Sequence, residues 1–167
     1  ASYRRQRQMC IRDRYYPVIF EEYSLHEGSG GAGSRRGGFG VNYKVRLRRG
    51  SAKASMVMDH GRSGPLGALG GENGGVNRVL IERNGETYIP PHLSKDQNIL
   101  IEEGDTIRVS TPGGGGYGNP FQRDPELVSR DVHRGYYSSE EAQERFGVVL
   151  NQDCSPDVDS THKLREP

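Results

Sequence analysis

The sequence feature that is most relevant to a chemical function is a run of four glycines. Gly113, Gly114, Gly115 and Gly116 are consecutive, and Tyr117 follows them. A run without side chains loses much conformational entropy on folding, so a folded protein keeps it where backbone must come very close to something else. That neighbour is either a bound ligand, which backbone N–H groups could contact, or another segment of the chain.

The surroundings of the run predict the order strand, glycine loop, helix, which phosphate-binding loops also show. Residues 105–110 alternate between polar and apolar, as in a half-buried strand, while Asp124 and Pro125 are typical of a helix start. A P-loop, however, needs Lys and then Ser or Thr after its last glycine, and a dinucleotide-binding loop begins its helix within the glycine spacing. Neither condition is met, so close packing and direct ligand contact both stay open.

Two adjacent arginines lie in a second glycine-rich segment. Arg35 and Arg36 fall within residues 29–40, which read SGGAGSRRGGFG. Nucleic-acid binding by such segments needs many repeated cations and stacking rings, and here there is one copy with one aromatic residue. Because guanidinium groups bind carboxylates and phosphates, we hypothesise instead that Arg35 or Arg36 stabilises an acidic substrate, a phosphorylated intermediate or a carboxylate of another subunit.

A third grouping combines an acid, a base and a cation. Asp59, His60 and Arg62 lie close together in sequence. Because adjacent residues of a strand point to opposite faces, a catalytic or metal-binding role would need further ligands from elsewhere in the fold. We therefore expect a surface or hydrogen-bonding role for His60, and we assign no catalytic residue and no metal site. The other histidines of this part of the chain lack even this context and are expected to be solvated: His26, His92 and His133.

Alternation and turn residues predict the elements that must position these groups. Strands are expected over residues 16–25, 41–48, 52–59, 76–83, 86–89, 99–101 and 106–110. Asn84 and Gly85 predict a tight hairpin, because Asn-Gly readily adopts positive φ angles. In the strand over 16–25, either Val18 and Phe20 or Ile19 faces inward, depending on the register.

Two short helices are expected after the strands. The first begins after Asp124 and ends near Gly135, and the second covers residues 139–146 with Ser138 as its cap and Gly147 as its stop. The sequence thus predicts a strand-rich α+β unit of about six strands with glycine-rich loops, closed by two short C-terminal helices.

Composition limits the classes of protein to which the chain can belong. It has 167 residues, of which 32% are hydrophobic and 24 are glycine, so the core is expected to be thin and the isolated chain marginally stable. With 23 Lys and Arg against 22 Asp and Glu, the whole chain has no electrostatic reason to bind nucleic acid. The two cysteines, Cys10 and Cys154, lie near opposite ends and predict no disulfide framework. Without a membrane-length apolar stretch or a signal-peptide pattern, we expect a cytoplasmic protein without membrane partners.

Three glycine-rich motifs in one order resemble the hydantoinase B and oxoprolinase family. The longest covers residues 111–150, which read TPGGGGYGNPFQRDPELVSRDVHRGYYSSEEAQERFGVVL. Residues 29–40 and 61–71 are similar to two upstream segments of that family. The resemblance extends over about residues 17–150. Within the family, the chain resembles an N-methylhydantoinase B-like subunit.

The resemblance implies a hydrolase acting on C–N bonds of cyclic amides, such as hydantoins and 5-oxoproline. Members work with a hydantoinase A-type partner that uses ATP, and by implication Mg²⁺, to activate the amide carbonyl before water opens the ring. We accordingly expect a hetero-oligomer with a small cyclic-amide substrate, no cofactor bound by this chain, and any divalent metal in a missing N-terminal part. By the same resemblance, residues 113–117 together with Arg35 and Arg36 are expected to form a substrate-binding or active-site loop.

Other functions stay open beside this one. The region could be a structural or assembly module without catalytic residues, or part of a related ATP-dependent ketone carboxylase. Family members are several times longer than this chain, so we expect it to be the C-terminal end of one and to be inactive alone.

The resemblance also divides the chain into three parts. Residues 1–14 show no family motif and their end resembles a translated sequencing adaptor, so we expect a non-native leader there. Residues 15–150 form the family domain. Residues 151–167 are polar and are expected to be a loose tail.

Overall fold

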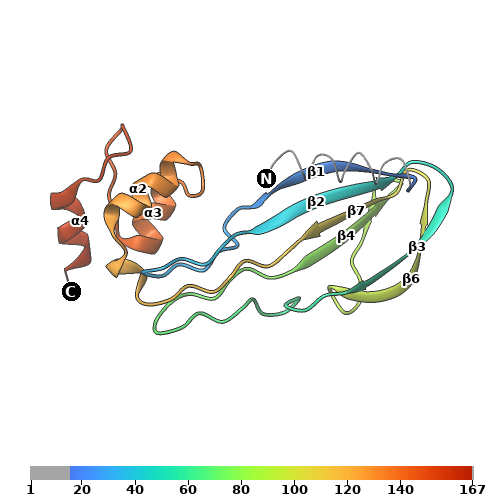
Figure 1. The fold of residues 1–167 in the computed structure, drawn as a ribbon, viewed down its shortest axis with the longest axis horizontal. Helices are drawn as coiled ribbons and strands as arrows, with labels where there is room; N and C mark the ends of the chain where they lie inside the picture. Colours follow the sequence, from blue (N-terminus) through green and yellow to red (C-terminus); the bar gives the residue numbers. More distant parts are fainter. Residues whose placement is uncertain (1–15, 167) are drawn as a thin grey trace. The chain divides into compact units, whose positions relative to one another are not determined.

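A computed structural model describes residues 16–166 of the chain, and within them seven strands precede the helices (Figure 1). The strands are β1 (Val18–His26), β2 (Gly40–Leu47), β3 (Ser51–Val57), β4 (Arg78–Arg83), β5 (Glu86–Tyr88), β6 (Lys95–Glu102) and β7 (Thr106–Ser110). The helices are the short 3₁₀ helix η1 (Pro120–Gln122), α2 (Pro125–His133), α3 (Ser139–Phe146) and α4 (Val158–Arg165). The predicted strand-rich α+β class is confirmed: each of the seven predicted strand ranges overlaps an observed strand, and there is one α-helix more than expected.

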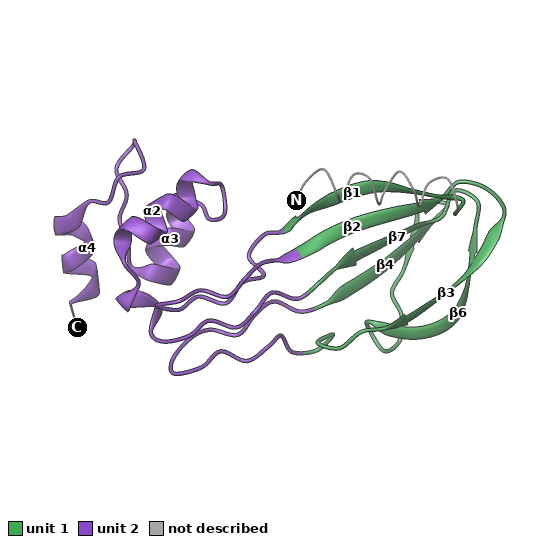
Figure 2. Ribbon diagram, in the orientation of Figure 1, with its two compact units in different colours: residues 1–25, 41–62, 77–111 green, residues 26–40, 63–76, 112–167 purple. Residues whose placement is uncertain are grey.

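The chain divides into two compact units, coloured separately in Figure 2. Unit 1 comprises residues 41–62, 77–111 and the segment that ends at Leu25. Unit 2 comprises residues 26–40, 63–76 and 112–167. Unit 2 is therefore built from two connections between strands and from the chain that follows β7.

Two antiparallel sheets make up unit 1. The larger has the order β1-β2-β7-β4-β5, and the smaller pairs β3 with β6. Both sheets contribute to one apolar cluster, whose buried members are Leu47, Met56, Val79, Ile81, Ile101 and Val109. Val18 also packs against this cluster, as one of the two registers predicted for the first strand requires, while Val18, Ile19 and Phe20 are all half-buried. The apolar faces of the two sheets thus form the core of unit 1.

The expected hairpin joins β4 to β5. Asn84 and Gly85 both have positive φ, 51° and 82°, as the turn requires. The strand β6 is longer than the expected residues 99–101, because it begins at Lys95. Its polar first half shows no alternation, and its pairing with β3 shifts register between Ala54 and Met56, so periodicity alone could not reveal it.

The two predicted helices of unit 2 are confirmed with their caps. The side chain of Asp124 accepts a hydrogen bond from the N–H of Glu126 at the start of α2. Ser138 and Glu141 form a reciprocal capping box at the start of α3, which ends at a left-handed Gly147. An apolar cluster of unit 2 has the buried members Ala32, Val128, Tyr137, Ala142, Phe146 and Val148.

The segment expected to be a loose tail contains the additional helix, α4. Asp157 caps its start by accepting from the N–H of Ser160, and Thr161 is buried. The guanidinium of Arg165 donates to the carbonyls of Phe146 and Arg123 at 2.8–3.1 Å. The expectation fails here because α4 is held by polar contacts and has no apolar stripe that a sequence pattern would reveal. The proposed leader, residues 1–14, lies outside the described residues.

Within residues 16–166 no helix is both long and apolar enough to cross a membrane.

Candidate functional site

The predicted site residues all belong to unit 2, where three glycine-rich segments form what we call the glycine bundle. The bundle consists of residues 28–40, 63–76 and 112–118, which run mostly outside regular strands. The last of these segments lies among the others. Gly114 O accepts from Gly31 N and Gly116 O from Ala68 N, both at 2.9 Å, while Gly114 N and Gly116 N donate to Gly38 O and Glu72 O, both at 2.8 Å.

Most glycines of the run face neighbouring backbone. A Cβ atom added at Gly113 would overlap the carbonyl of Ser29, and one at Gly116 would overlap the carbonyl of Ala32. Gly115 is restricted in the same way by Leu66. As in collagen, where only glycine fits at the crowded axis, these positions exclude any side chain. In this chain the run therefore packs against other backbone segments, the second of the two neighbours considered from the sequence.

Gly114 differs from its neighbours in the run. The nearest atom to a Cβ at this position would be the backbone N of Gly38, at 3.4 Å, an ordinary van der Waals contact. The close approach of the two segments instead restricts Gly37, because a Cβ at Gly37 would overlap the carbonyl of Gly114. The run thus contains one position that tolerates a methyl group, which provides an internal control.

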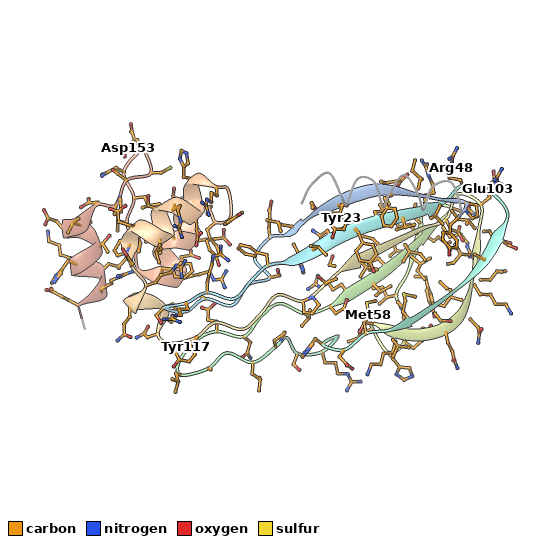
Figure 3. All side chains as sticks on the ribbon, in the orientation of Figure 1. Tyr23, Arg48, Met58, Glu103, Tyr117 and Asp153 are labelled. Carbon is orange, nitrogen blue, oxygen red and sulfur yellow. The ribbon has the colours of Figure 1, made fainter. Side chains whose placement is uncertain are left out.

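Tyr117 and Arg35 lie side by side at the end of the bundle. Their backbones form an antiparallel bridge, with Arg35 N donating to Tyr117 O at 3.0 Å and Tyr117 N to Arg35 O at 2.8 Å. Both residues are exposed, and Tyr117, labelled in Figure 3, has half of its surface accessible. Of the predicted site residues, these two have side chains that a substrate or a partner could contact.

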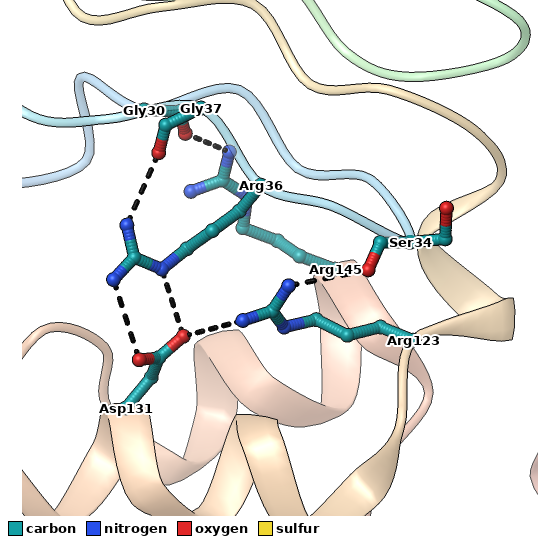
Figure 4. A network of polar contacts seen from close by, with 7 residues as sticks. All are labelled: Gly30, Ser34, Arg36, Gly37, Arg123, Asp131 and Arg145. Carbon is teal, nitrogen blue, oxygen red and sulfur yellow. Dashed lines mark hydrogen bonds and ion pairs between the residues drawn. The ribbon is translucent and has the colours of Figure 1, made fainter.

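Arg36 instead points into unit 2 and pairs with a carboxylate. Its Nε lies 2.8 Å from Asp131 Oδ2 and its Nη2 3.3 Å from Oδ1, and its Nη1 donates to Gly37 O (Figure 4). Arg123 also donates to Asp131 Oδ2, at 2.9 Å. Only 2% of the Asp131 side chain is exposed. A carboxylate for Arg36 is therefore supplied within the same unit of this chain.

Aromatic rings surround the paired arginines. The guanidinium carbon of Arg36 lies 4.8 Å from the ring centre of Phe39 and 5.2 Å from that of Tyr136. The hydrogen bonds that Arg36 donates to Asp131 raise the pKa of Arg36 above its ordinary value. Cation–π contacts and a bidentate carboxylate together fix the position of this arginine.

A third arginine connects the helices to the bundle. Arg145 donates from Nη2 to Glu72 Oε2 at 2.8 Å and to Gly30 O at 3.1 Å, the latter shown in Figure 4. Its guanidinium carbon also lies 5.4 Å from the ring centre of Tyr137. Glu72 in turn accepts from the N–H of Ala32. Segments far apart in sequence are thereby held in one geometry.

Two buried polar atoms in this region have no hydrogen-bond partner among residues 16–166. They are the hydroxyl of Tyr137 and the Nε of Arg123. Burial raises the pKa of Tyr137 above its ordinary value, although the nearby arginines oppose this effect. The phenol therefore stays neutral at physiological pH and carries no negative charge that could balance the arginines.

Sequence reasoning identified Arg36 but missed its partners. Asp131 follows the buried Val128 by three residues on α2, so helical spacing places it on the inward face, where a carboxylate needs a cation. Arg145 likewise follows the buried Ala142 by three residues on α3. The sequence signal that could have identified both residues is a charged side chain on the apolar face of a short helix.

Asp59, His60 and Arg62 lie in unit 1 and not with these residues. Across residues 16–166, no group of three or more His, Cys, Asp or Glu side chains is arranged to hold a metal ion. Unit 2 can thus offer a rigid backbone scaffold, an exposed tyrosine and an exposed arginine, with a buried ion-pair network behind them.

Comparison with known proteins gives a family match for most of the chain. Residues 6–120 match the family described as Hydantoinase B/oxoprolinase. The match begins within the segment expected to be a non-native leader, and it includes all four glycines of the run.

Two curated relatives and one solved structure extend the likeness. The putative D-/L-hydantoinase B subunit of Pseudomonas sp. (strain NS671) is 32% identical over 154 residues, covering 92% of this chain and 26% of the relative. The caprolactamase beta subunit of Pseudomonas jessenii is 35% identical over 158 residues, covering 90% and 26%. The crystal structure of the ATP-dependent caprolactamase from Pseudomonas jessenii matches with a TM-score of 0.75 at 27% identity, over 94% of this chain and 28% of that one. The chain thus spans about a quarter of the length of these relatives.

Proposed function

Because this chain belongs to the hydantoinase B/oxoprolinase family, we propose that it forms the C-terminal part of the B-type component of an ATP-dependent cyclic-amide hydrolase. The observation that carries the proposal is the family match over residues 6–120. It is supported by a hydantoinase and a caprolactamase component, each aligned over 90% or more of this chain. The reaction would be hydrolysis of a ring C–N bond in a hydantoin, in 5-oxoproline or in a lactam.

We propose that a hydantoinase A-type partner binds ATP and Mg²⁺ and that this chain binds neither. The glycine run lacks the Lys and Ser or Thr of a P-loop, and the N–H groups of Gly114 and Gly116 already donate to carbonyls. ATP would supply the activation of the amide carbonyl when bound to the partner. Both relatives are named as components of larger enzymes, which supports a hetero-oligomer.

Within that enzyme, the glycine bundle would position the residues at its end. Arg36 contributes through its pairing with Asp131, which orders the bundle, so we assign it a positioning role. Arg35 and Tyr117 are exposed and adjacent, so they are the residues that could contact the substrate or the partner. Arg35 could stabilise negative charge on the amide oxygen, and Tyr117 could donate a hydrogen bond to it.

The alternative is that unit 2 serves only in assembly of the enzyme. The observation that favours it is the contact of the glycine run with other backbone segments, which explains these glycines without a ligand. In that case Arg35 and Tyr117 would contact the partner protein.

The test uses the full-length reading frame that contains this chain, co-expressed with its hydantoinase A-type partner. ATP-dependent opening of hydantoin, 5-oxoproline and caprolactam is measured, together with complex assembly by size-exclusion chromatography. We expect Arg35→Ala and Tyr117→Ala to lower turnover at least tenfold while the complex still assembles. Loss of assembly in these variants would instead establish the assembly role.

One further outcome decides the reaction class, and a control variant accompanies the test. A wild-type complex that opens none of these rings but carboxylates a ketone at the expense of ATP would overturn the hydrolase assignment. Glu144→Ala, which removes an exposed charge from α3, serves as the matched surface control and is expected to leave turnover unchanged.

A further inference from the structure

A polar hollow in unit 1 brings together two loops that are far apart in sequence. Residues 58–62, which follow β3, form one side, and residues 92–95, which lead into β6, form the other. The hollow has a volume of about 230 Å³. It joins His92, expected from the sequence to be an ordinary solvated residue, to the grouping of Asp59, His60 and Arg62.

The two loops are fixed to each other by hydrogen bonds. Met58 N donates to Ser94 O at 3.2 Å, and the buried Ser94 hydroxyl donates to Met58 O at 2.8 Å. Asn77 N donates to His60 O at 2.8 Å, which anchors the first loop from a third segment. The walls of the hollow are therefore held in place by interactions that do not involve its charged side chains.

Both loops also contain a residue in the left-handed region. His60 has φ 63° and Leu93 has φ 62°, and neither is a glycine. Such conformations are unfavourable for residues other than glycine and persist where the surroundings impose them. A Cβ at Gly61 would lie 2.9 Å from the Ser94 hydroxyl, so the loops touch where the chain turns. This unfavourable backbone orients His60 and its neighbours around the hollow.

The charged side chains that line the hollow are mostly basic. They are Asp59, His60, Arg62, His92 and Lys95, so four basic groups face a single carboxylate. Lys95 Nζ lies 2.7 Å from Asp59 Oδ1, and this pair lowers the pKa of Asp59 below its ordinary value. With Lys95 balanced by Asp59, Arg62 contributes a net positive charge, which increases when either imidazole is protonated.

We propose that this hollow binds a small dianionic oxyanion of the sulfate or phosphate type. A single carboxylate among four basic groups disfavours a divalent cation, which prefers several oxygen ligands. The volume is below the range of about 300–1,000 Å³ usual for drug-sized ligands, so it suits an isolated oxyanion and not a nucleotide. The proposal is independent of the proposed hydrolase activity, because every residue that it uses belongs to unit 1.

Sulfate is the probe for the test because it carries two negative charges at neutral pH. The protein is labelled with ¹³C at histidine Cε1, and sulfate is titrated at constant ionic strength while the histidine resonances are followed by NMR. The 167-residue chain is used if its amide spectrum is dispersed, and otherwise the full-length protein. At a fixed pH near neutrality, we expect saturable shifts of the His60 and His92 resonances.

Variants establish that the hollow is the site. We expect sulfate binding to weaken at least threefold in Arg62→Gln and also in the double variant His60→Gln, His92→Gln. In the double variant, binding is followed by the backbone amide resonances of Gly61 and Lys95. Lys53→Gln, which removes an exposed charge from β3, and His133→Gln, an exposed histidine of α2, are the matched controls and should leave the affinity unchanged. A parallel titration with inorganic phosphate at pH 8 should move the same resonances.

Several results would overturn the proposal. Shifts that grow linearly without saturation, or that are equally large at His133, would indicate an adventitious ion only. Unchanged affinity in Arg62→Gln, with the amide spectrum of the native fold retained, would exclude the hollow as the binding site.

Discussion

The two units of this chain are stabilised in different ways. Unit 1 is a conventional pair of sheets whose apolar side chains meet in one cluster, with residues such as Val79 and Ile81 almost fully buried. Unit 2 has an apolar cluster around its helices, but its glycine bundle is held by backbone contacts and by arginines that reach across it. Side-chain volume therefore determines the packing of unit 1, whereas in the bundle the absence of side chains does so.

This difference predicts different sensitivities to mutation. A core built from apolar side chains loses stability gradually as methyl groups are removed, and its loss scales with the volume lost. A backbone bundle should fail abruptly when a single methyl group is added, and an ion-pair network should fail when its shared carboxylate is removed. The predictions below measure that contrast, from the largest expected effect to the smallest.

Asp131→Ala is expected to have the largest effect. The substitution leaves Arg36 and Arg123 without their common carboxylate, and only 7% of the Arg123 side chain is exposed. Removing one partner of a buried ion pair typically costs about 3–5 kcal/mol. Urea denaturation followed by circular dichroism would measure the loss, with Glu144→Ala as the control for charge removal from a helix. A loss below about 1 kcal/mol would show that the network contributes little to unit 2.

Gly116→Ala is expected to cost about 3 kcal/mol, because the new methyl group overlaps the carbonyl of Ala32 and neighbouring backbone must move. Gly114→Ala is the matched control, since its methyl group would lie 3.4 Å from the nearest atom. Hydrogen exchange measured by mass spectrometry should show faster exchange in residues 28–40 and 63–76 of the first variant alone. Equal behaviour of the two variants would contradict the backbone-packing interpretation of the run.

Ile81→Val tests the apolar core of unit 1. Removal of one methylene from this buried residue of β4 should cost about 1 kcal/mol, as in other apolar cores. Ile89→Val is the control, because Ile89 is 56% exposed and its substitution should lower the free energy of unfolding much less. In hydrogen exchange, the faster exchange of the Ile81 variant should be confined to unit 1 peptides. A loss as large as that of Gly116→Ala would remove the proposed contrast between the units.

Most of the strands and the first two α-helices could be predicted because local patterns specify them. Asn84 and Gly85 determine their own turn, and Ser138 with Glu141 determines the start of α3. The glycine run could be recognised as a place of close approach, but its neighbours could not, because Ser29, Ala32 and Leu66 come from distant segments and leave no periodic trace in the sequence. The predicted role of the run in an active site stays a prediction.

Residues that act through polar contacts were the hardest to predict. Arg36 was singled out from its glycine-rich context, yet its partner Asp131 lies 95 positions away and only the fold brings them together. The same holds for α4, which is anchored by Arg165 and Thr161 and not by an apolar face. The sequence around His92 contains no other residues that suggest a site. In the fold, the loop that contains Asp59, His60 and Arg62 lies on the other side of the same hollow.

The smallest expected effect is a pH dependence that arises in unit 1. Arg83 donates from Nε and Nη2 to Asp105 Oδ2 at 2.8 and 2.6 Å, and this pairing is the main reason why the pKa of Asp105 lies below its ordinary value. A carboxyl group with a lowered pKa in the folded state stabilises that state above its unfolded pKa, near about 3.9, and the contribution is lost as the pH falls through the folded value. Because 39% of the Arg83 side chain is exposed, water screens the pair and the effect should be modest.

Asp105→Asn should therefore be less stable than the wild-type chain at pH 7, and the difference should narrow as the pH falls below about 4. Urea midpoints measured at pH 7, 5, 4 and 3 would follow it, since other titrating carboxyl groups affect both proteins equally. Glu103→Gln, at an exposed neighbouring position, is the control and should show no such convergence. Equal stability of the two proteins at every pH would mean that Asp105 acts through the hydrogen bond that it accepts from Glu102 N, which an amide oxygen can also accept, and not through its charge.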